Sequence, residues 1–196
     1  MDIFEGLNDK QKEAVEDTEG PCLIIAGAGS GKTKVLTHKI ANLINKGVNP
    51  WNILAITFTN KAANEMKTRV EKLIGEDTSK DMWIGTFHSI CVRILRRTIE
   101  QIGFDRSFVI FDTTDQRSLI KKCIKQLEID DKLYSDRSVQ AEISNAKNEM
   151  LEPTEYAKKY AGDFRKEKIA EIYTLYQKEL KANNAIDFDD IINYTI

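Results

Sequence analysis

The residues best suited to chemistry form a glycine-rich run near the start of the chain. Glycine lets successive backbone amides turn inward around an anion, because no Cβ blocks that path. A lysine at the end of such a run can lie against the β- and γ-phosphates of a nucleotide, and a following hydroxyl can hold Mg²⁺. The pattern therefore predicts an ATP phosphate loop with Lys32 and Thr33 as catalytic residues and Thr33 as the Mg²⁺ ligand; its residues are Ala26, Gly27, Ala28, Gly29, Ser30, Gly31, Lys32 and Thr33.

One position departs from the general pattern G-x-x-x-x-G-K-[ST], because Ala26 stands where that pattern has glycine. Alanine is small, so the departure is tolerable. The alternative is a glycine-rich turn before an ordinary helix. The flanks favour the phosphate loop: residues 22–25 are apolar and predict a strand, and residues 35–44 have helical apolar spacing. Such a helix would direct the positive end of its dipole at the bound anion.

Gln11 lies just ahead of the loop, on a short helix that we expect Asn8 or Asp9 to cap. Its amide offers both a donor and an acceptor, which can pair with the N6/N7 edge of adenine. A lone glutamine on a helix is usually a solvated surface residue. Its place before the loop makes adenine binding the sharper hypothesis.

Two further groups of residues follow apolar runs that predict strands at 53–58 and 82–86. In open α/β sheets, ligands bind at the carboxyl ends of the strands, and an aromatic ring there can stack on a base. The bland interpretation is a core phenylalanine followed by a routine helix cap. From the residues alone the core-and-cap interpretation is favoured, and the alternative that stays open is a contact with nucleic acid through Phe58, Thr59, Asn60, Thr86, Phe87 and His88.

The acidic residues give no clear metal site. Asp112 follows a fourth predicted strand at 107–112, but no glutamate follows it to orient a water, and residues 113–116 read as a capping box. The late acids Asp187, Asp189 and Asp190 could suggest a metal site, although acids at a helix start are the commoner explanation. His88 has no partner at metal-ligand spacing.

The order of these elements predicts an α/β fold with a parallel sheet, followed by a helical part. After residue 113 no further strand is expected, and helices are predicted at about 115–128, 138–150, 154–161 and 164–182.

Composition limits the class of protein. The chain has 196 residues, of which 41% are hydrophobic and 31% charged, as in a soluble globular protein. Its net charge of −2 predicts no strong general attraction to nucleic acid, so local patches must bind any DNA. Three widely spaced cysteines, the lack of a signal peptide and the lack of a membrane-length apolar run predict a cytoplasmic protein with reduced thiols and no membrane partner.

Together the motifs resemble those of the UvrD/PcrA/Rep group of superfamily 1 DNA helicases, and most closely the PcrA-type members. The matching stretches are L-N-x-x-Q-x-x-A-V from residue 7, A-G-A-G-S-G-K-T from 26, I-T-F-T-N-K-A-A from 56, G-T-F-H-S from 85 and D-F-D-D from 187. They occur in order along nearly the whole chain.

The resemblance implies an ATP-dependent 3′→5′ helicase that translocates on single-stranded DNA and meets single-strand/duplex junctions. It implies that the residues at the two strand ends, 58–60 and 86–88, contact the single strand. It implies a partial RecA-like P-loop NTPase sheet (subdomain 1A) over residues 1–111. It further implies the inserted, all-helical subdomain 1B, and the start of the return to 1A, over residues 112–196. Its cofactors would be ATP and Mg²⁺, and its partners could include repair or replication proteins.

The family pattern continues beyond D-F-D-D to an Asp-Glu pair that binds Mg²⁺ and activates water, and to a C-terminal motor domain that supplies arginine fingers. This chain shows neither, so we expect it to bind ATP and part of the DNA without hydrolysing ATP alone. Two alternatives stay open: a P-loop nucleotide kinase or transferase, and a non-catalytic nucleotide- or DNA-binding module.

Overall fold

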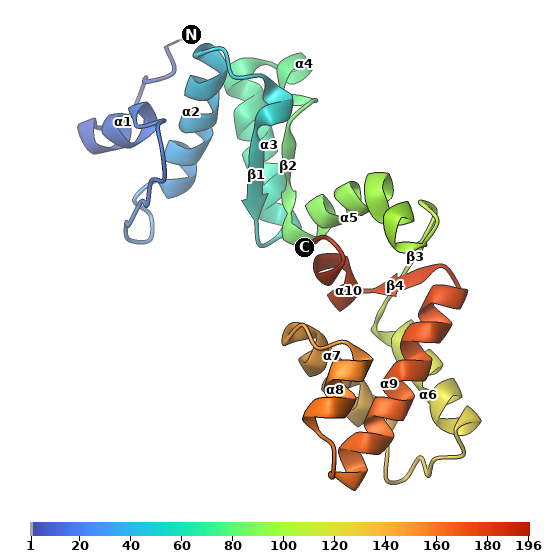
Figure 1. The fold of residues 1–196 in the computed structure, drawn as a ribbon. Helices are drawn as coiled ribbons and strands as arrows, with labels where there is room; N and C mark the ends of the chain where they lie inside the picture. The colour runs from blue at the N-terminus through green and yellow to red at the C-terminus, as the bar shows by residue number, and fades with distance from the viewer. Residues whose placement is uncertain (1) are drawn as a thin grey trace. The chain divides into compact units, whose positions relative to one another are not determined.

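The structure is a computed structural model that describes residues 2–196. Its contacts divide the chain after Ile90 into two compact units, residues 1–90 and 91–196. Both units combine helices with one short two-stranded parallel sheet (Figure 1). The mixed helix and strand composition confirms the predicted α/β class in outline. The boundary at 111/112, which the resemblance implies, concerns subdomains of a longer protein and stays a prediction.

The first unit places two helices beside each other and a third on a small sheet. β1 (Leu54–Thr57) pairs in parallel with β2 (Trp83–Thr86), in a register that matches Leu54 with Trp83 and Thr57 with Thr86. The helices are α1 (Asp9–Glu16), α2 (Lys32–Asn45), α3 (Asn60–Ile74) and α4 (Glu76–Ser79), with a 3-10 turn at Pro50–Asn52. The core behind β1 includes Ile40, Ile53, Ala55, Met66, Val70 and Met82.

Local signals set the ends of these helices. The side chain of Asn8 caps α1 and that of Thr59 caps α3, each by accepting a hydrogen bond from a first-turn amide. Gly75 ends α3 at a positive φ. The Asn8 cap is one of the two that the sequence predicts. The short helix α4 follows Gly75 directly.

The strand predicted at residues 22–25 does not form, and this prediction is wrong for the structure. The segment has no regular secondary structure, and Leu23 and Ile25 are 85% and 86% exposed. A strand is stabilised by the ladder of a neighbour and by burial of its faces. Within the described residues neither sheet supplies 22–25 with a neighbouring strand, so an apolar, β-branched sequence alone does not make one.

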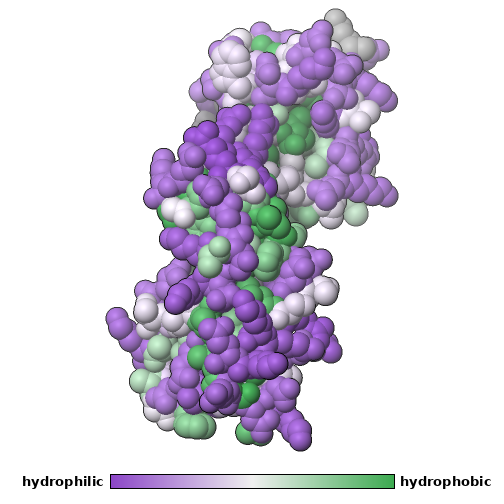
Figure 2. Space-filling view, turned by 90° about the vertical axis from the view of Figure 1, so that its right-hand side faces the viewer, coloured by the Kyte–Doolittle hydropathy of each residue, from purple (hydrophilic) through white to green (hydrophobic). Residues whose placement is uncertain are grey.

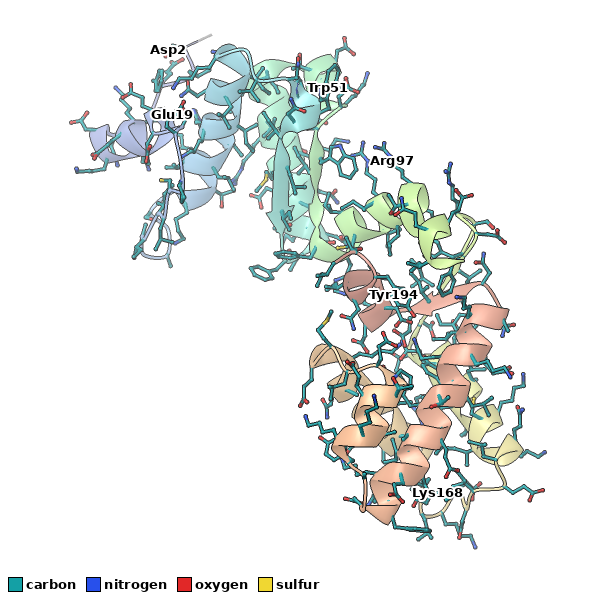
Figure 3. The ribbon with its side chains drawn as sticks, in the orientation of Figure 1. Asp2, Glu19, Trp51, Arg97, Lys168 and Tyr194 are labelled. Carbon is teal, nitrogen blue, oxygen red and sulfur yellow. The ribbon has the colours of Figure 1, made fainter. Side chains whose placement is uncertain are left out.

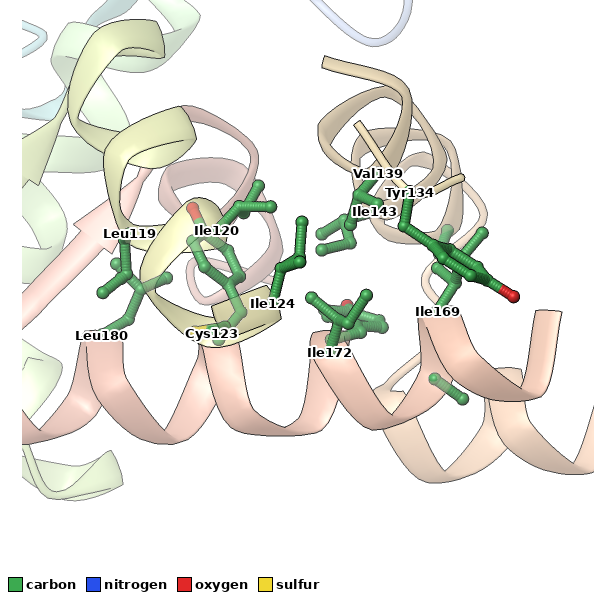
Figure 4. Packing of buried hydrophobic residues seen from close by; sticks show 14 of the residues in the cluster. Leu119, Ile120, Cys123, Ile124, Tyr134, Val139, Ile143, Ile169, Ile172 and Leu180 are labelled. Carbon is green, nitrogen blue, oxygen red and sulfur yellow. The ribbon is translucent and has the colours of Figure 1, made fainter. Parts of the chain in front are cut away.

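The second unit is mainly helical. α5 (Phe87–Thr98) leads into it, followed by a 3-10 turn at Ile99–Ile102, α6 (Thr113–Gln126), α7 (Asp136–Asn148), α8 (Pro153–Lys159), α9 (Phe164–Ala182) and α10 (Phe188–Asn193). Its main core packs α6, α7 and α8 against α9 through residues such as Ile120, Ile124, Val139 and Ile172 (Figure 4). The expected bounds of α9 match the structure.

Two expectations for this unit are corrected. A further strand exists after residue 113: β4 (Ala185–Asp187) pairs in parallel with β3 (Val109–Phe111), matching Val109 with Ala185. Three residues are too few to show strand periodicity, and pairing with β3 is what defines β4. The capping box of α6 begins one residue earlier than expected, with Asp112 as the cap and Asp115 as its partner.

Most of the visible surface is hydrophilic, with scattered hydrophobic patches (Figure 2). Exposed large apolar side chains include Phe58, Phe87, Leu133 and Phe164. Among residues 2–196, no helix combines the length and the apolar character needed to cross a bilayer.

Candidate nucleotide and DNA sites

The predicted phosphate loop is an exposed turn that leads directly into α2. Residues 26–30 are exposed, and Gly29 and Gly31 have φ values of 75° and 88°, which glycine adopts without steric cost. Lys32 Nζ folds back over the loop and donates to the carbonyl oxygens of Ala26 and Gly27, at 2.7 Å each. Ser30 Oγ also donates to the Gly27 oxygen. The ammonium group of Lys32 is therefore bound by carbonyl oxygens of the loop that precedes it.

The N-terminus of α2 is open to an anion. Its cap residue is Gly31, which has no side chain that could accept a hydrogen bond from the first amides of the helix. The first four amides of any helix lack intrahelical partners and carry the positive end of the dipole, so an uncapped start favours a phosphate. The residues present thus fit the triphosphate group of a nucleoside triphosphate. The exposed Thr33 hydroxyl, in the first turn, is where Mg²⁺ would be held.

An open cavity of about 640 Å³ adjoins this helix start. Its lining is strongly basic, which suits a polyanionic ligand. The lining residues are Gly29, Gly31, Lys32, Thr33, Lys34, Thr37, His38, Arg69, Lys72 and Leu73.

Gln11 reaches the loop, as its predicted role requires. Its Nε2 donates to the Ser30 carbonyl oxygen at 3.0 Å, and its Oε1 accepts from the backbone amide of Asn8 at 3.1 Å. A Cβ added at Gly31 would lie 2.7 Å from Gln11 Nε2. Gly31 is therefore required both by its left-handed backbone and by the close approach of this amide.

The two strand-end groups lie together, as the parallel register demands. Thr57 and Thr86 are paired, so Phe58 and Phe87 follow side by side with ring centroids 5.7 Å apart and planes tilted by 46°. Phe58 is 90% exposed, which overturns the interpretation of Phe58 as a core residue. Two adjacent exposed rings are a platform on which bases can stack.

The polar residues beside the rings have local roles. Thr59 caps α3, and Asn60 is the first residue of that helix. Ser89 accepts from the Thr86 amide and donates to the Thr86 carbonyl oxygen, which fixes the turn between β2 and α5. His88 lies in the first turn of α5. The structure thus groups the predicted residues into two clusters, both within the first unit.

The late acids belong to a buried ion cluster that sequence reasoning missed. Lys147 Nζ lies 2.6 Å from Asp187 Oδ2 and 2.6 Å from Asp190 Oδ1, and all three side chains are nearly inaccessible to solvent. Tyr176 Oη donates to Asp187 at 2.9 Å. Asp187 also caps α10, with Asp190 as its capping-box partner, so the predicted cap is confirmed. Lys147 lies 40 residues before Asp187, so the D-F-D-D motif alone could not predict this ion pair.

The two carboxyl groups of this cluster differ in acidity. Burial opposes ionisation of Asp187, but the charge and hydrogen bond of Lys147 outweigh it and lower the pKa of Asp187. Burial raises the pKa of Asp190 to about 6; Lys147 opposes this rise and the negative charge of Asp187 adds to it. Tyr194, labelled in Figure 3, is the C-cap residue of α10 and accepts a hydrogen bond from Gln177 at 3.0 Å.

The acids that the sequence singles out have partners within the protein. Among residues 2–196 no group of three or more His, Cys, Asp or Glu side chains comes together for that purpose. Asp112 caps α6, while Asp187 and Asp190 bind Lys147. The cap role of Asp112 is thus observed, and its exclusion as a metal ligand stays a prediction.

Comparison with known proteins gives a consistent family. The model of the UvrD/REP helicase N-terminal domain matches residues 7–196. The chain is 55% identical to the ATP-dependent DNA helicase PcrA of Leuconostoc citreum and 54% identical to those of Bacillus subtilis and Staphylococcus epidermidis. Each match covers 99% of this chain and 26% of the relative. The chain therefore spans about a quarter of the length of these relatives.

Proposed function

Because the chain belongs to the family of the UvrD/REP helicase N-terminal domain, we propose that it is the ATP-binding part, and part of the DNA-binding surface, of an ATP-dependent DNA helicase. The complete enzyme would move 3′→5′ along single-stranded DNA in the cytoplasm. It would use ATP and Mg²⁺ and a C-terminal motor domain, and it would act in DNA repair or replication.

The observation that carries the proposal is the open helix start beneath a glycine loop and a lysine. Loop amides and the first amides of α2 would bind the triphosphate, with Lys32 turning from the Ala26 and Gly27 carbonyl oxygens to the β- and γ-phosphates. Thr33 would hold Mg²⁺, which supplies charge neutralisation on the phosphates. Gln11 would pair with adenine after leaving Ser30.

The exposed ring pair would grip the DNA. Stacking is tolerant of sequence because every base has a π-face, and this suits a motor that must pass any sequence. Thr59, Asn60, Thr86 and His88 would contact phosphate or sugar beside the rings.

We propose that these 196 residues bind without sustained hydrolysis. The observation that favours this is the full engagement of the candidate acids: Asp112 in a helix cap, Asp187 and Asp190 with Lys147. Nothing then remains at these positions to orient an attacking water. This part of the proposal would be contradicted if the wild-type chain hydrolysed ATP at steady state and the Lys32→Ala variant did not.

The nucleotide site is tested by titrating the chain with a fluorescent ATP analogue and Mg²⁺. Removing one charged hydrogen-bond donor costs about 1.5–3 kcal/mol, so Lys32→Ala should weaken binding roughly 10- to 100-fold. Lys39→Ala, on the same helix, is the matched control and should bind as wild type. Equal affinity of the Lys32 and Lys39 variants would reject the assigned loop.

The DNA site is tested by the anisotropy of a labelled oligothymidylate. Loss of one stacking ring costs about 1–3 kcal/mol, so Phe58→Ala should weaken binding by on the order of 10-fold or more. Trp51→Ala removes another exposed ring of the same unit, which is 60% exposed, and should have no effect. If both variants bind DNA equally well, the strand-end platform is not the DNA site.

A further inference from the structure

One face of α2 carries four polar residues spaced four apart, and all four hold the N-terminal segment. Each forms a hydrogen bond to a backbone carbonyl oxygen of residues 3–16. A spacing of four returns to the same face of a helix, so the donors form a single row. We name this row the polar ladder; it consists of Lys34, His38, Asn42 and Lys46.

The first half of the polar ladder holds the segment before α1. Lys34 Nζ donates to the Gly6 oxygen at 2.7 Å, and His38 Nδ1 donates to the Ile3 oxygen at 2.5 Å. Gly6 has a φ of 72°, and a Cβ added there would lie 3.1 Å from Lys34 Nζ. The turn at Gly6 therefore brings its carbonyl group close to the helix.

The second half caps the end of α1. The last carbonyl groups of a helix have no intrahelical partner. Asn42 Nδ2 donates to the Val15 oxygen at 2.9 Å, and Lys46 Nζ lies 3.4 Å from the Glu16 oxygen and 2.7 Å from Thr18 Oγ1. Asn42 is buried and Val15 is fully buried, so this bond forms away from water.

Gln11 lies on α1 between the two points that the ladder fixes. An apolar contact of Leu7, Val15 and Val35 fills the space between α1 and α2. The loop begins the same helix that carries the ladder, so α2 holds the phosphate loop at its N-terminus and α1 along its side (Figure 1). The distance from the Gln11 amide to the loop is thus set through α2.

We propose that the polar ladder is a positioning device for base selection: it holds the Gln11 amide where it distinguishes adenine from other bases, while the loop alone binds the triphosphate. The inference rests on the proposed nucleotide site. Selective hydrogen bonding requires a donor and acceptor held within about 0.5 Å of their geometry, which a loosely attached α1 does not supply. Lys34, His38, Asn42 and Lys46 are positioning residues and do not touch the nucleotide through this role.

The test measures the affinities of the 196-residue chain for ATP, GTP and inorganic tripolyphosphate by competition with a fluorescent ATP analogue. Wild type should prefer ATP to GTP by about tenfold, the worth of about one good hydrogen-bonding interaction. Asn42→Ala and Lys46→Met, which change residues outside the cavity lining, should each reduce the preference toward one, and tripolyphosphate affinity should stay within about twofold. Lys46→Arg keeps a donor and should restore the preference.

Matched controls exist on the same helix. Asn45→Ala and Lys39→Met change the same residue types off the ladder and should keep the wild-type preference. Gln11→Ala should remove the preference, and adding Asn42→Ala to it should change the preference no further, because both act through one amide. Far-UV circular dichroism shows whether each variant is folded.

The outcomes separate two failures. Equal losses for ATP, GTP and tripolyphosphate in folded ladder variants, or an unchanged ATP preference, would overturn the positioning role and leave the nucleotide site intact. A wild-type chain without ATP preference would overturn it as well. Tripolyphosphate binding that does not depend on Lys32 would instead reject the nucleotide site itself.

Discussion

Lys32 and Lys147 show how differently one residue type can be used in the two units. Lys32 is exposed and donates to two neutral carbonyl oxygens of its own loop. Lys147 is 2% exposed and binds the carboxylates of Asp187 and Asp190, near the C-terminal end of the second unit. The partners of the first lysine are open to solvent, and the partners of the second are buried with it.

The surroundings of the two lysines determine which ammonium group is available to bind a ligand. A hydrogen bond to a neutral carbonyl group at the surface exchanges readily with water or an anion, and surface substitutions usually change stability by less than about 0.5 kcal/mol. A buried ammonium group with two carboxylates would leave uncompensated charges if it moved, at a cost of several kcal/mol. The exposed lysine is therefore suited to a nucleotide and the buried lysine to holding α7, β4 and α10 together.

The chain offers separate probes for the two lysines. Both tryptophans, Trp51 and Trp83, lie in the first unit, and all six tyrosines lie in the second. Trp51 and Tyr194 are labelled in Figure 3. Tryptophan fluorescence thus follows unfolding around Lys32, and tyrosine signals follow unfolding around Lys147.

Lys147→Met should give the largest effect. It leaves Asp187 and Asp190 buried without a counter-ion, so the free energy of unfolding of the second unit should fall by about 3–5 kcal/mol. Urea denaturation followed by tyrosine signals measures the loss. Lys178→Met, on an exposed position of α9, is the control. A loss below about 1 kcal/mol would remove the contrast between the two lysines.

The pH dependence of the second unit should come next. With a native pKa of about 6 against about 3.9 unfolded, Asp190 binds more protons in the folded state, so stability should fall as the pH rises from 4 to 6. The lowered pKa of Asp187 acts only below that window. Both histidines lie in the first unit and do not interfere. Asp190→Asn should flatten the slope in urea titrations; an unchanged slope would assign it to other groups.

Tyr176→Phe should have a moderate effect. It removes the hydroxyl that donates to Asp187, a bond to a charged group worth about 1.5 kcal/mol, without removing the ring. Tyr134→Phe, at another buried tyrosine of the unit, is the control. If the two variants unfold at the same urea concentration, the hydroxyl adds nothing to the cluster.

Lys32→Met should have the smallest effect on stability. Its partners are exposed carbonyl oxygens, so the free energy of unfolding of the first unit should change by less than about 0.5 kcal/mol while ATP-analogue affinity falls at least about tenfold. Tryptophan-monitored urea denaturation beside a nucleotide titration checks both. A stability loss above about 1 kcal/mol would give Lys32 a structural role like that of Lys147.

Features that depend on near neighbours could be predicted from the amino-acid sequence alone. Glycine spacing placed the loop, side-chain caps placed the starts of α1 and α3, and apolar spacing gave α9 from Phe164 to Ala182. These signals act over a few residues, so they need no partner elsewhere. The resemblance to helicases also rested on such short motifs, and the family comparison confirms it.

Features that depend on residues distant in sequence became visible only in the folded structure. Residues 22–25 have a strand sequence and no ladder, whereas Ala185–Asp187 has little strand sequence and pairs with β3. In the sequence nothing distinguishes Lys147 from other lysines; its role follows from its contacts with Asp187 and Asp190. The polar ladder can be recognised only because residues 3–16 lie along α2. The physical reason is that strand pairing and the burial of charge are settled by groups far away in sequence, which local patterns do not record.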